Sequence, residues 1–300
     1  MAKKNGNRKN TLWEAGAEAF VHLNLDVPHY GYVCPLCVRL FRKSEIDLLS
    51  IDHVPPKSVG GKKLMLTCRD CNSHAGHSIE NHLANLQKIQ DFNSGKCFLP
   101  QKLTTDKVKD LNVEVRMSRD GVRVAALPQN NPPGKTKLWG QELEHRYQTG
   151  QGIPDLQLAI SLPRADPQKV AIAWLKAGFL AAFSVFGYRY ALSRELKLVR
   201  DQIRHPEKKL ITAFGQPFDN ADISAREIVV VTEPDWLKGI AVQIGSCLVF
   251  LPYTESADTF FAKLAMQSGR KAEIKGFSYG WPSKPQFLWD KCNFKRPYDA

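Results

Sequence analysis

The most apolar stretch of the chain is VAIAWLKAGFLAAFSVFG, residues 170–187. Asp166-Pro167 stands shortly before it and is a favourable start for a helix. A membrane-spanning helix needs about 20 apolar residues, whereas this stretch contains Lys176 and is soon followed by Arg189. The pattern therefore predicts the buried core helix of a protein that does not cross a membrane.

Alternating apolar and polar positions predict strands on both sides of this helix. Residues 111–126 alternate around Asp120-Gly121, which is a strong hairpin signal. Residues 130–134, NNPPG, indicate a loop or linker. Further strands are expected at 156–162, 227–232, 239–244 and 247–252, and further helices at 138–148, 193–203 and 256–267.

The N-terminal residues change from a polar tail to a helical pattern. Residues 1–10, MAKKNGNRKN, are polar and basic and predict a disordered tail. The next four residues, TLWE, form a capping-box pattern, so a helix is expected from about residue 12 to residue 22. Its apolar side, which includes Trp13 and Phe20, would pack against the module that follows.

Composition limits the kind of partner. The 300 residues suffice for one large domain or two ordinary ones, and an apolar fraction of 43% is normal for a globular protein. A formal net charge of +12 favours a polyanionic partner, DNA or RNA. Residues 1–100 contain 13 Lys and Arg against 9 Asp and Glu, which leaves a net charge of +8 for residues 101–300. We expect one domain over 1–100 and a second over 101–300, with the boundary between residues 97 and 134.

The cysteines indicate a metal site. Seven cysteines without a leading signal-peptide pattern indicate a reducing interior, and hence a cytoplasmic location. Four of them form two Cys-x-x-Cys pairs, Cys34/Cys37 and Cys68/Cys71, which together can complete the tetrahedral shell of one Zn²⁺ ion. A site of four cysteines is normally structural and closed, so we expect the chemistry from groups that the zinc holds in place.

An Asp-His pair and an Asn are the candidates for that chemistry. Asp52 offers the hard oxygen ligand that Mg²⁺ prefers, and His53 can act as a general base near neutral pH. Neighbouring side chains of a strand point to opposite faces, so the two groups would approach a phosphate from different directions. Asn72 follows the last cysteine and opens an expected helix over residues 72–90, where its amide oxygen could reach the same metal.

The motifs Cys-x-x-Cys, Ile-Asp-His-Val-Pro, Gly-Gly and Leu-Thr-Cys-x-x-Cys-Asn resemble the HNH endonucleases with a ββα-metal fold, above all their four-cysteine branch and the HNH domain of RNA-guided nucleases. The resemblance covers residues 30–83 only. It implies that Asp52 and Asn72 bind Mg²⁺ or Mn²⁺, that His53 activates the attacking water, and that the cysteines staple the ββα unit. Lys63 stands where family members usually carry an Asn that buttresses the catalytic His. Either another group orients that His, for example a backbone carbonyl, or activity is reduced.

Further histidines and basic residues surround these motifs. His77 lies five residues after Asn72, close to one helical turn, and could contact the metal or the scissile phosphate. The alternative is a side chain in solvent, and His74 and His82 are expected to be surface residues of this kind. The basic residues near enough in sequence to hold phosphates are Lys57, Lys62, Lys63 and Arg69.

Residues 274–294 interleave aromatic side chains with lysines. This pattern suits stacking of a single nucleic acid strand and also the edge of a core, and we favour the core interpretation. The aromatic residues concerned are Phe277, Tyr279, Trp281, Phe287, Trp289 and Phe294.

The sequence thus predicts an α+β fold, with an N-terminal ββα-metal module and structural zinc, followed by antiparallel strands packed around a buried helix. The predicted function is a metal-dependent endonuclease that hydrolyses phosphodiester bonds of DNA. One alternative is a zinc module that binds nucleic acid without cutting it. Another is a nuclease effector, as in bacterial or phage defence, whose C-terminal half binds a regulatory protein or small molecule. The sequence assigns no oligomeric state.

Overall fold

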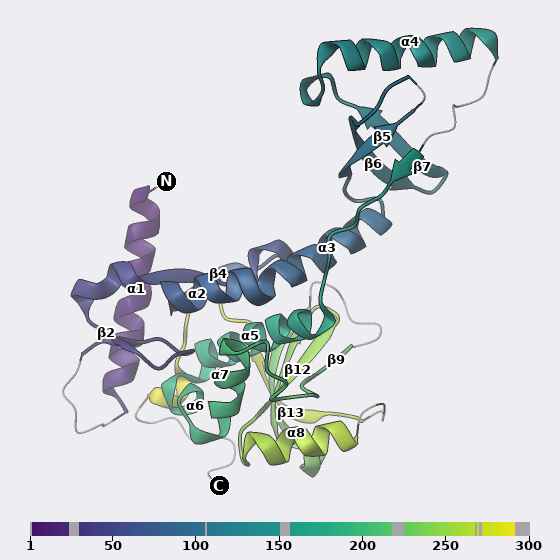
Figure 1. The fold of residues 1–300 in the computed structure, drawn as a ribbon. Helices are drawn as coiled ribbons and strands as arrows, with labels where there is room; N and C mark the ends of the chain where they lie inside the picture. The colour runs from purple at the N-terminus through teal and green to yellow at the C-terminus, as the bar shows by residue number, and fades with distance from the viewer. Residues whose placement is uncertain are drawn as a thin grey trace. The chain divides into compact units, whose positions relative to one another are not determined.

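The computed structural model describes residues 2–23, 30–105, 107–150, 157–217, 225–267, 269 and 272–291 (Figure 1). The chain divides into two compact units, one made of residues 1–83 with 166–300 and the other of residues 84–165. This division differs from the predicted boundary between residues 97 and 134. The reason is the apolar helix after residue 166, which contacts both the N-terminal hairpin and the large C-terminal sheet. A functional domain over residues 1–100 and another over 101–300 stay predictions.

The N-terminal module contains a ββα unit. Strands β3 (Leu49–Val54) and β4 (Lys62–Cys68) form an antiparallel hairpin, and helix α2 (Arg69–Ala75) starts directly after β4. The last five residues of β4 are all buried, which anchors the hairpin on the core. A small two-stranded sheet precedes the hairpin, and a π-helical turn follows α2; their bounds are β1 (Tyr32–Val33), β2 (Leu40–Phe41), the turn Gly76–Glu80 and α3 (Asn81–Asn93).

Helix α1 (Ala2–Val21) begins earlier than the sequence predicted. The expectation of a disordered tail over residues 1–10 is wrong for residues 2–10, which are helical. Thr11 lies inside the helix, and its hydroxyl donates to the carbonyl four residues back instead of capping a helix start. A tertiary contact stabilises this early turn, because the Arg8 guanidinium donates to the backbone carbonyl of Lys63 at 2.5 Å.

Helix α5 (Pro167–Phe186) is the core helix that the apolar stretch predicted. The Asp166 carboxylate caps it by accepting the backbone N–H groups of Gln168 at 2.9 Å and Lys169 at 3.2 Å. By length and composition alone the helix could cross a membrane, and it is the single such helix among the described residues. However, 83% of its most apolar window is buried inside the structure, which confirms the prediction of a core helix.

Five antiparallel strands form the sheet against which α5 packs. In spatial order they are β13 (Lys275–Gly280), β10 (Arg226–Glu233), β11 (Gly239–Ile244), β12 (Cys247–Pro252) and β9 (Gly215–Pro217). The helices of this part are α6 (Tyr188–Ala191), α7 (Lys197–Arg204) and α8 (Ala257–Met266) (Figure 1). The strands predicted at 227–232, 239–244 and 247–252 and the helix predicted at 256–267 are therefore confirmed.

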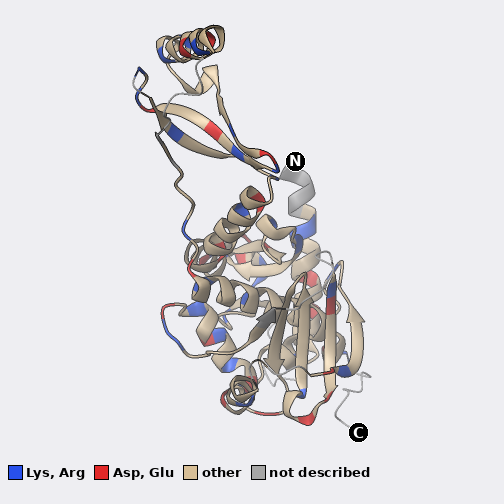
Figure 2. Cartoon of the chain, turned by 90° about the vertical axis from the view of Figure 1, so that its right-hand side faces the viewer, with Lys and Arg blue, Asp and Glu red and all other residues tan. Residues whose placement is uncertain are grey.

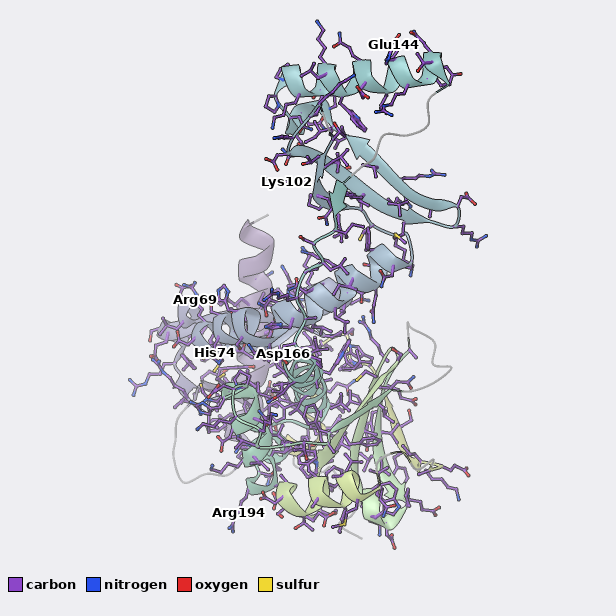
Figure 3. All side chains as sticks on the ribbon, turned by 45° about the vertical axis from the view of Figure 1, so that its right-hand side comes forward. Arg69, His74, Lys102, Glu144, Asp166 and Arg194 are labelled. Carbon is purple, nitrogen blue, oxygen red and sulfur yellow. The ribbon has the colours of Figure 1, made fainter. Side chains whose placement is uncertain are left out.

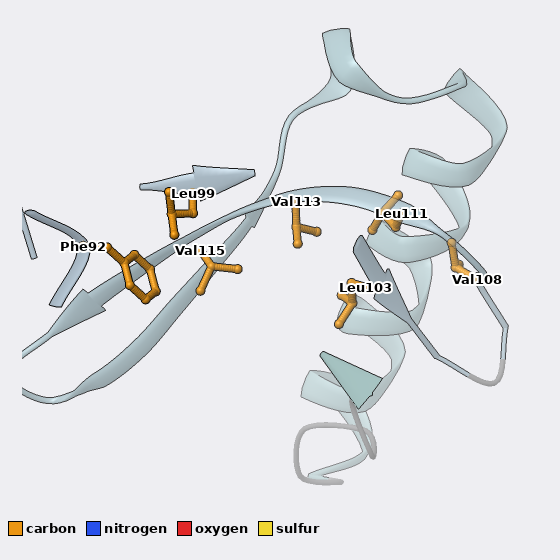
Figure 4. Close-up of a cluster of buried hydrophobic side chains, with 7 residues drawn as sticks. All are labelled: Phe92, Leu99, Leu103, Val108, Leu111, Val113 and Val115. Atoms are coloured by element: carbon orange, nitrogen blue, oxygen red, sulfur yellow. The ribbon is translucent and has the colours of Figure 1, made fainter. Parts of the chain in front are cut away.

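The second unit is a four-stranded antiparallel sheet with a helix. The strands lie in the order β7 (Gly121–Ala126), β6 (Leu111–Ser118), β5 (Leu99–Thr104) and β8 (Gln157–Ala159), and the helix is α4 (Pro133–Thr149). The predicted hairpin over residues 111–126 is confirmed, since Ser118 pairs with Gly121 across the turn. The buried cluster of this unit, drawn in Figure 4, consists of Phe92, Leu99, Leu103, Val108, Leu111, Val113 and Val115.

The two ends of the second unit are tied together by hydrogen bonds. The Asn85 side-chain amide donates to the backbone carbonyl of Arg164 at 2.8 Å. The Gln101 side chain bonds Ser161 twice, donating to its carbonyl at 3.1 Å and accepting its N–H at 2.9 Å. The chain therefore enters and leaves this unit at neighbouring positions.

The aromatic residues near the C-terminus are divided between core and surface. Phe287 and Trp289 are buried, as the core interpretation predicted. Phe277 on β13 is exposed over 56% of its surface, so the core interpretation fails at that position. Phe294 lies outside the described residues.

Gly187, which joins α5 to α6, leaves no room for a side chain. Its φ of +89° is the left-handed region that favours glycine, and a Cβ would lie 2.0 Å from Oδ2 of Asp290. That carboxylate accepts the backbone N–H groups of Tyr188 at 2.7 Å and Arg189 at 2.9 Å. A side chain at Gly187 would therefore strain the backbone and displace a buried acceptor.

We expect Gly187→Ala to lower the free energy of unfolding by about 2 kcal/mol or more, because strain and lost hydrogen bonds add. Urea denaturation followed by circular dichroism measures the change. Gly140→Ala is the control: Gly140 is an exposed glycine of α4 with nothing within 4 Å of its Cβ position. The control should be neutral or stabilising by up to about 1 kcal/mol. Equal stability of the two variants would contradict the expected strain.

Candidate metal centre and catalytic site

Four cysteines converge on one point beside the ββα unit. Cys34 and Cys37 come from the turn after β1, Cys68 ends β4, and Cys71 lies in the first turn of α2. Their Sγ atoms all lie within 4.8 Å of one another. The donor set fits one tetrahedral Zn²⁺ ion, since zinc takes four thiolates at about 2.3 Å. The predicted pairing of the two Cys-x-x-Cys motifs is therefore compatible with the geometry.

The backbone around this cluster favours negative charge on sulfur. The N–H of Cys68 points to Sγ of Cys34 at 3.4 Å, and the N–H of Cys71 points to Sγ of Cys68 at the same distance. Hydrogen bonding with the Cys34 thiol lowers the pKa of Cys68 to about 7, whereas burial raises the pKa of Cys34 and hydrogen bonding with the Cys34 thiol raises that of Cys71. Zinc binds thiolates, and the two backbone N–H groups favour this form of Cys34 and Cys68.

The β3–β4 hairpin places Asp52 and His53 in different surroundings. The register of the two strands shifts between them, so that Asp52 pairs with Met65 and His53 with Lys63. Asp52 is buried, with 3% of its surface exposed, whereas His53 is only partly buried. The neighbouring side chains thus face a protein interior and a more open surface, respectively.

The Asp52 carboxylate belongs to a buried cluster of charges. Its Oδ2 accepts the Thr67 hydroxyl at 3.1 Å and the Lys176 ammonium of α5 at 2.8 Å. The same ammonium lies 2.5 Å from Oε1 of Glu80, in the π-helical turn. The Lys176 side chain is 2% exposed and that of Glu80 is 18% exposed. One ammonium from the core helix thus joins two carboxylates of the N-terminal module.

Burial and pairing oppose each other in this cluster. Burial by itself lowers the pKa of Lys176, but the carboxylates of Asp52 and Glu80 together raise it above its ordinary value. Burial and the charge of Asp52 together raise the pKa of Glu80 more than the nearby ammonium lowers it. Lys176 is therefore charged at neutral pH, and the cluster contains one cation for two acids.

His53 lies among basic groups. Burial is the main cause that lowers its pKa, and the charges of Lys63, Lys57 and Arg8 lower it further, against the opposing effect of Asp52. The imidazole is accordingly neutral at neutral pH, which is the form that can accept a proton. This arrangement can remove a proton from a bound water in surroundings that attract phosphate.

The turn between β3 and β4 is fixed from outside the hairpin. The Arg8 guanidinium of α1 bonds the Lys63 carbonyl, as described above, and Arg226 of β10 donates to the Gly60 carbonyl at 2.9 Å. Lys57 and Lys62 on this turn are exposed, and so is Arg69 at the start of α2. Lys and Arg residues, coloured blue in Figure 2, also occur along the other described elements. The basic residues predicted to contact phosphate thus lie on or next to the hairpin.

The remaining predicted residues lie on the helix after β4. Asn72 is partly buried in α2, and His77 is exposed in the π-helical turn. His74 is exposed, as predicted, and is labelled with Arg69 in Figure 3. His82 is not a free surface residue, because its Nδ1 accepts the backbone N–H of Asp166 at 3.1 Å. The metal-binding roles of Asn72 and His77 stay predictions.

Sequence reasoning missed four side chains that shape the site: Arg8, Thr67, Lys176 and Arg226. A signal existed for Lys176, because a lysine inside a predicted core helix requires an acidic partner. That partner, Asp52, lies 124 positions away in the sequence, so it could not be read from spacing. Arg8 and Arg226 bond backbone carbonyls, and such contacts have no sequence pattern.

The site thus combines a hairpin that carries a histidine, the helix that follows it and a cluster of four cysteines. The model of the HNH endonuclease family matches residues 34–87, which confirms the resemblance. This part of the chain is an HNH endonuclease region, and it points to nuclease activity and to a nucleic acid substrate. A search of curated proteins and a search of solved structures returned no match.

Proposed function

We propose that the protein is an endonuclease that hydrolyses phosphodiester bonds of DNA, with His53 as the general base. The observation that carries the proposal is a partly buried imidazole on an HNH hairpin, with Arg8, Lys57 and Lys63 close enough for their charges to lower its pKa. We also propose that the protein is cytoplasmic and acts as an effector in bacterial or phage defence.

His53 would take a proton from a water molecule, which then attacks the phosphorus in line with the leaving 3′ oxygen. Lys57, Lys62, Lys63 and Arg69 would hold the flanking phosphates, which positions the scissile bond without reading sequence. The zinc would hold β4 and α2 together and take no part in the chemistry.

A divalent ion is expected at Asp52 and Asn72, with His77 as a further candidate ligand. Mg²⁺ or Mn²⁺ bound there would polarise the phosphate and stabilise the leaving oxygen. In the arrangement described above, such an ion has no open position at Oδ2 of Asp52, because the residue is buried and that oxygen already accepts an ammonium and a hydroxyl. No step of the proposed reaction is therefore assigned to the ion.

Plasmid cleavage tests the proposal. Supercoiled plasmid incubated with the zinc-loaded protein should be nicked or linearised, and parallel reactions with and without added Mg²⁺ or Mn²⁺ show whether cleavage needs the expected divalent ion. Cleavage that requires added cell lysate would favour the alternative of a nuclease gated by a partner of the C-terminal half. Plasmid that is bound but uncut under all conditions would instead favour a zinc module without catalysis.

Lys63 provides a test of the phosphate contacts. We expect Lys63→Ala to weaken DNA binding and to reduce the slope of log K against log salt by about 1, because one phosphate contact is lost. Fluorescence anisotropy at two or more salt concentrations measures both quantities. Lys209→Ala, which changes an exposed lysine after α7, is the control and should leave the slope unchanged. A faster Lys63→Asn enzyme with unchanged affinity would show that this position buttresses His53 instead.

A further inference from the structure

Lys176 contacts a carboxylate oxygen of Asp52, the residue expected to bind a divalent metal ion. The side chain leaves α5, a helix whose other buried members are apolar or small, and reaches the hairpin of the HNH region. Its Nζ lies 2.8 Å from Oδ2 of Asp52, where a divalent ion would bind at about 2.1 Å. An ammonium and a divalent ion that share one buried carboxylate oxygen repel each other strongly at low dielectric, so the presence of one weakens the binding of the other.

Glu80 gives the ammonium a second partner. Its Oε1 lies 2.5 Å from Nζ of Lys176, and its side chain is more exposed than that of Asp52. If Asp52 changes partner, Lys176 keeps a carboxylate and no unpaired buried charge is created, which is the situation that would be strongly unfavourable. A lysine also has a flexible four-carbon stem, so its ammonium can move while the helix stays in place.

We propose that Lys176 is an internal counter-cation which competes with a divalent metal ion for Asp52, and that Glu80 retains Lys176 when the metal binds. This inference rests on the proposed function in taking Asp52 as a carboxylate of the nuclease site. The core helix of the C-terminal part thereby sets the metal affinity of the HNH region.

The test is the affinity of the full-length, zinc-loaded protein for Mn²⁺ alone, measured by titration with electron paramagnetic resonance of the free ion. Lys176→Met keeps the volume of the side chain and removes the charge, so it should tighten Mn²⁺ binding by about tenfold. Glu80→Gln should weaken binding several-fold, because Lys176 then has Asp52 as its remaining carboxylate. The two substitutions should change the Mn²⁺ affinity in opposite directions. General disruption of the fold would instead weaken Mn²⁺ binding in both variants.

The double variant Lys176→Met with Glu80→Gln decides how Glu80 acts. If Glu80 acts through the lysine, the double variant should bind Mn²⁺ as tightly as Lys176→Met. Binding as weak as in Glu80→Gln would make Glu80 a direct ligand and would overturn the assigned role. In an Asp52→Asn background, Lys176→Met should no longer change the affinity.

An unchanged Mn²⁺ affinity in a folded Lys176→Met protein would overturn the proposal. If that variant does not fold, the Glu80→Gln protein decides, and an affinity equal to that of the native protein is the negative result. Plasmid cleavage by the native protein is assayed separately. Competition for Mn²⁺ without any cleavage would defeat the proposed nuclease function and leave the competition standing.

Discussion

Replacing His53 with alanine should lower the rate of DNA cleavage by about two to four orders of magnitude, the usual contribution of a general base. His53 is not a member of the four-cysteine cluster and is only partly buried, so the variant should fold and bind DNA normally. Single-turnover cleavage of a labelled duplex measures the rate, and circular dichroism checks the fold. His145→Ala, at an exposed histidine of α4, is the matched control and should cleave at the native rate.

The pH dependence gives a second check on His53. Its pKa is lowered from the ordinary value of about 6.5, mainly by burial, so the imidazole stays neutral to lower pH than a free histidine. Cleavage requires the neutral form and should fall as the pH drops through the lowered pKa. The midpoint of this acid limb should therefore lie below about pH 6.5. A folded His53→Ala protein that cleaves at the native rate, with the same fall in rate at low pH, would show that His53 is not the general base.

Replacing Cys68 with serine should remove the zinc and much of the soluble protein. Cys68 contributes one of the four sulfurs and also joins β4 to α2, so its loss opens the metal site at the centre of the ββα unit. Binding energy at such a site is folding energy, because the unfolded chain has no preformed site. Elemental analysis should give about one zinc per chain for the native protein and none for the variant.

Cys97→Ser is the control for the zinc prediction. Cys97 is partly buried and does not belong to the four-cysteine cluster. This variant should keep its zinc and its yield. A Cys68→Ser protein that is metal-free yet fully folded and cooperative in thermal unfolding would contradict a structural zinc.

The parts of the fold that local patterns determine could be predicted. The spacing of the cysteines predicted a cluster whose sulfurs the structure brings together, and the apolar run predicted α5 as a buried helix. The alternation around Asp120-Gly121 predicted the hairpin of β6 and β7. Each of these features follows from residues close together in the chain, where periodicity and turn chemistry act.

The parts that depend on distant contacts could not be predicted. The start of α1 depends on the bond from Arg8 to the carbonyl of Lys63, 55 positions away. The surroundings of Asp52 depend on Lys176, which sequence reasoning used only as an argument against a membrane span. In both cases tertiary packing determines which group the charged side chain contacts, and the local sequence does not indicate that partner.

The insertion of residues 84–165 between two halves of one compact unit also bears on how the chain folds. Segments that must meet are far apart in sequence, as with the Tyr188 hydroxyl, which donates to the carbonyl of Val33 155 positions away. Closing a long flexible loop costs conformational entropy that grows with its length. The bond from Asn85 to the carbonyl of Arg164 brings the ends of the insertion together. Once the insertion has folded, the effective loop between its two ends is short. The entropic cost of bringing residues 166–300 to the HNH region is then close to the cost for two nearly consecutive segments.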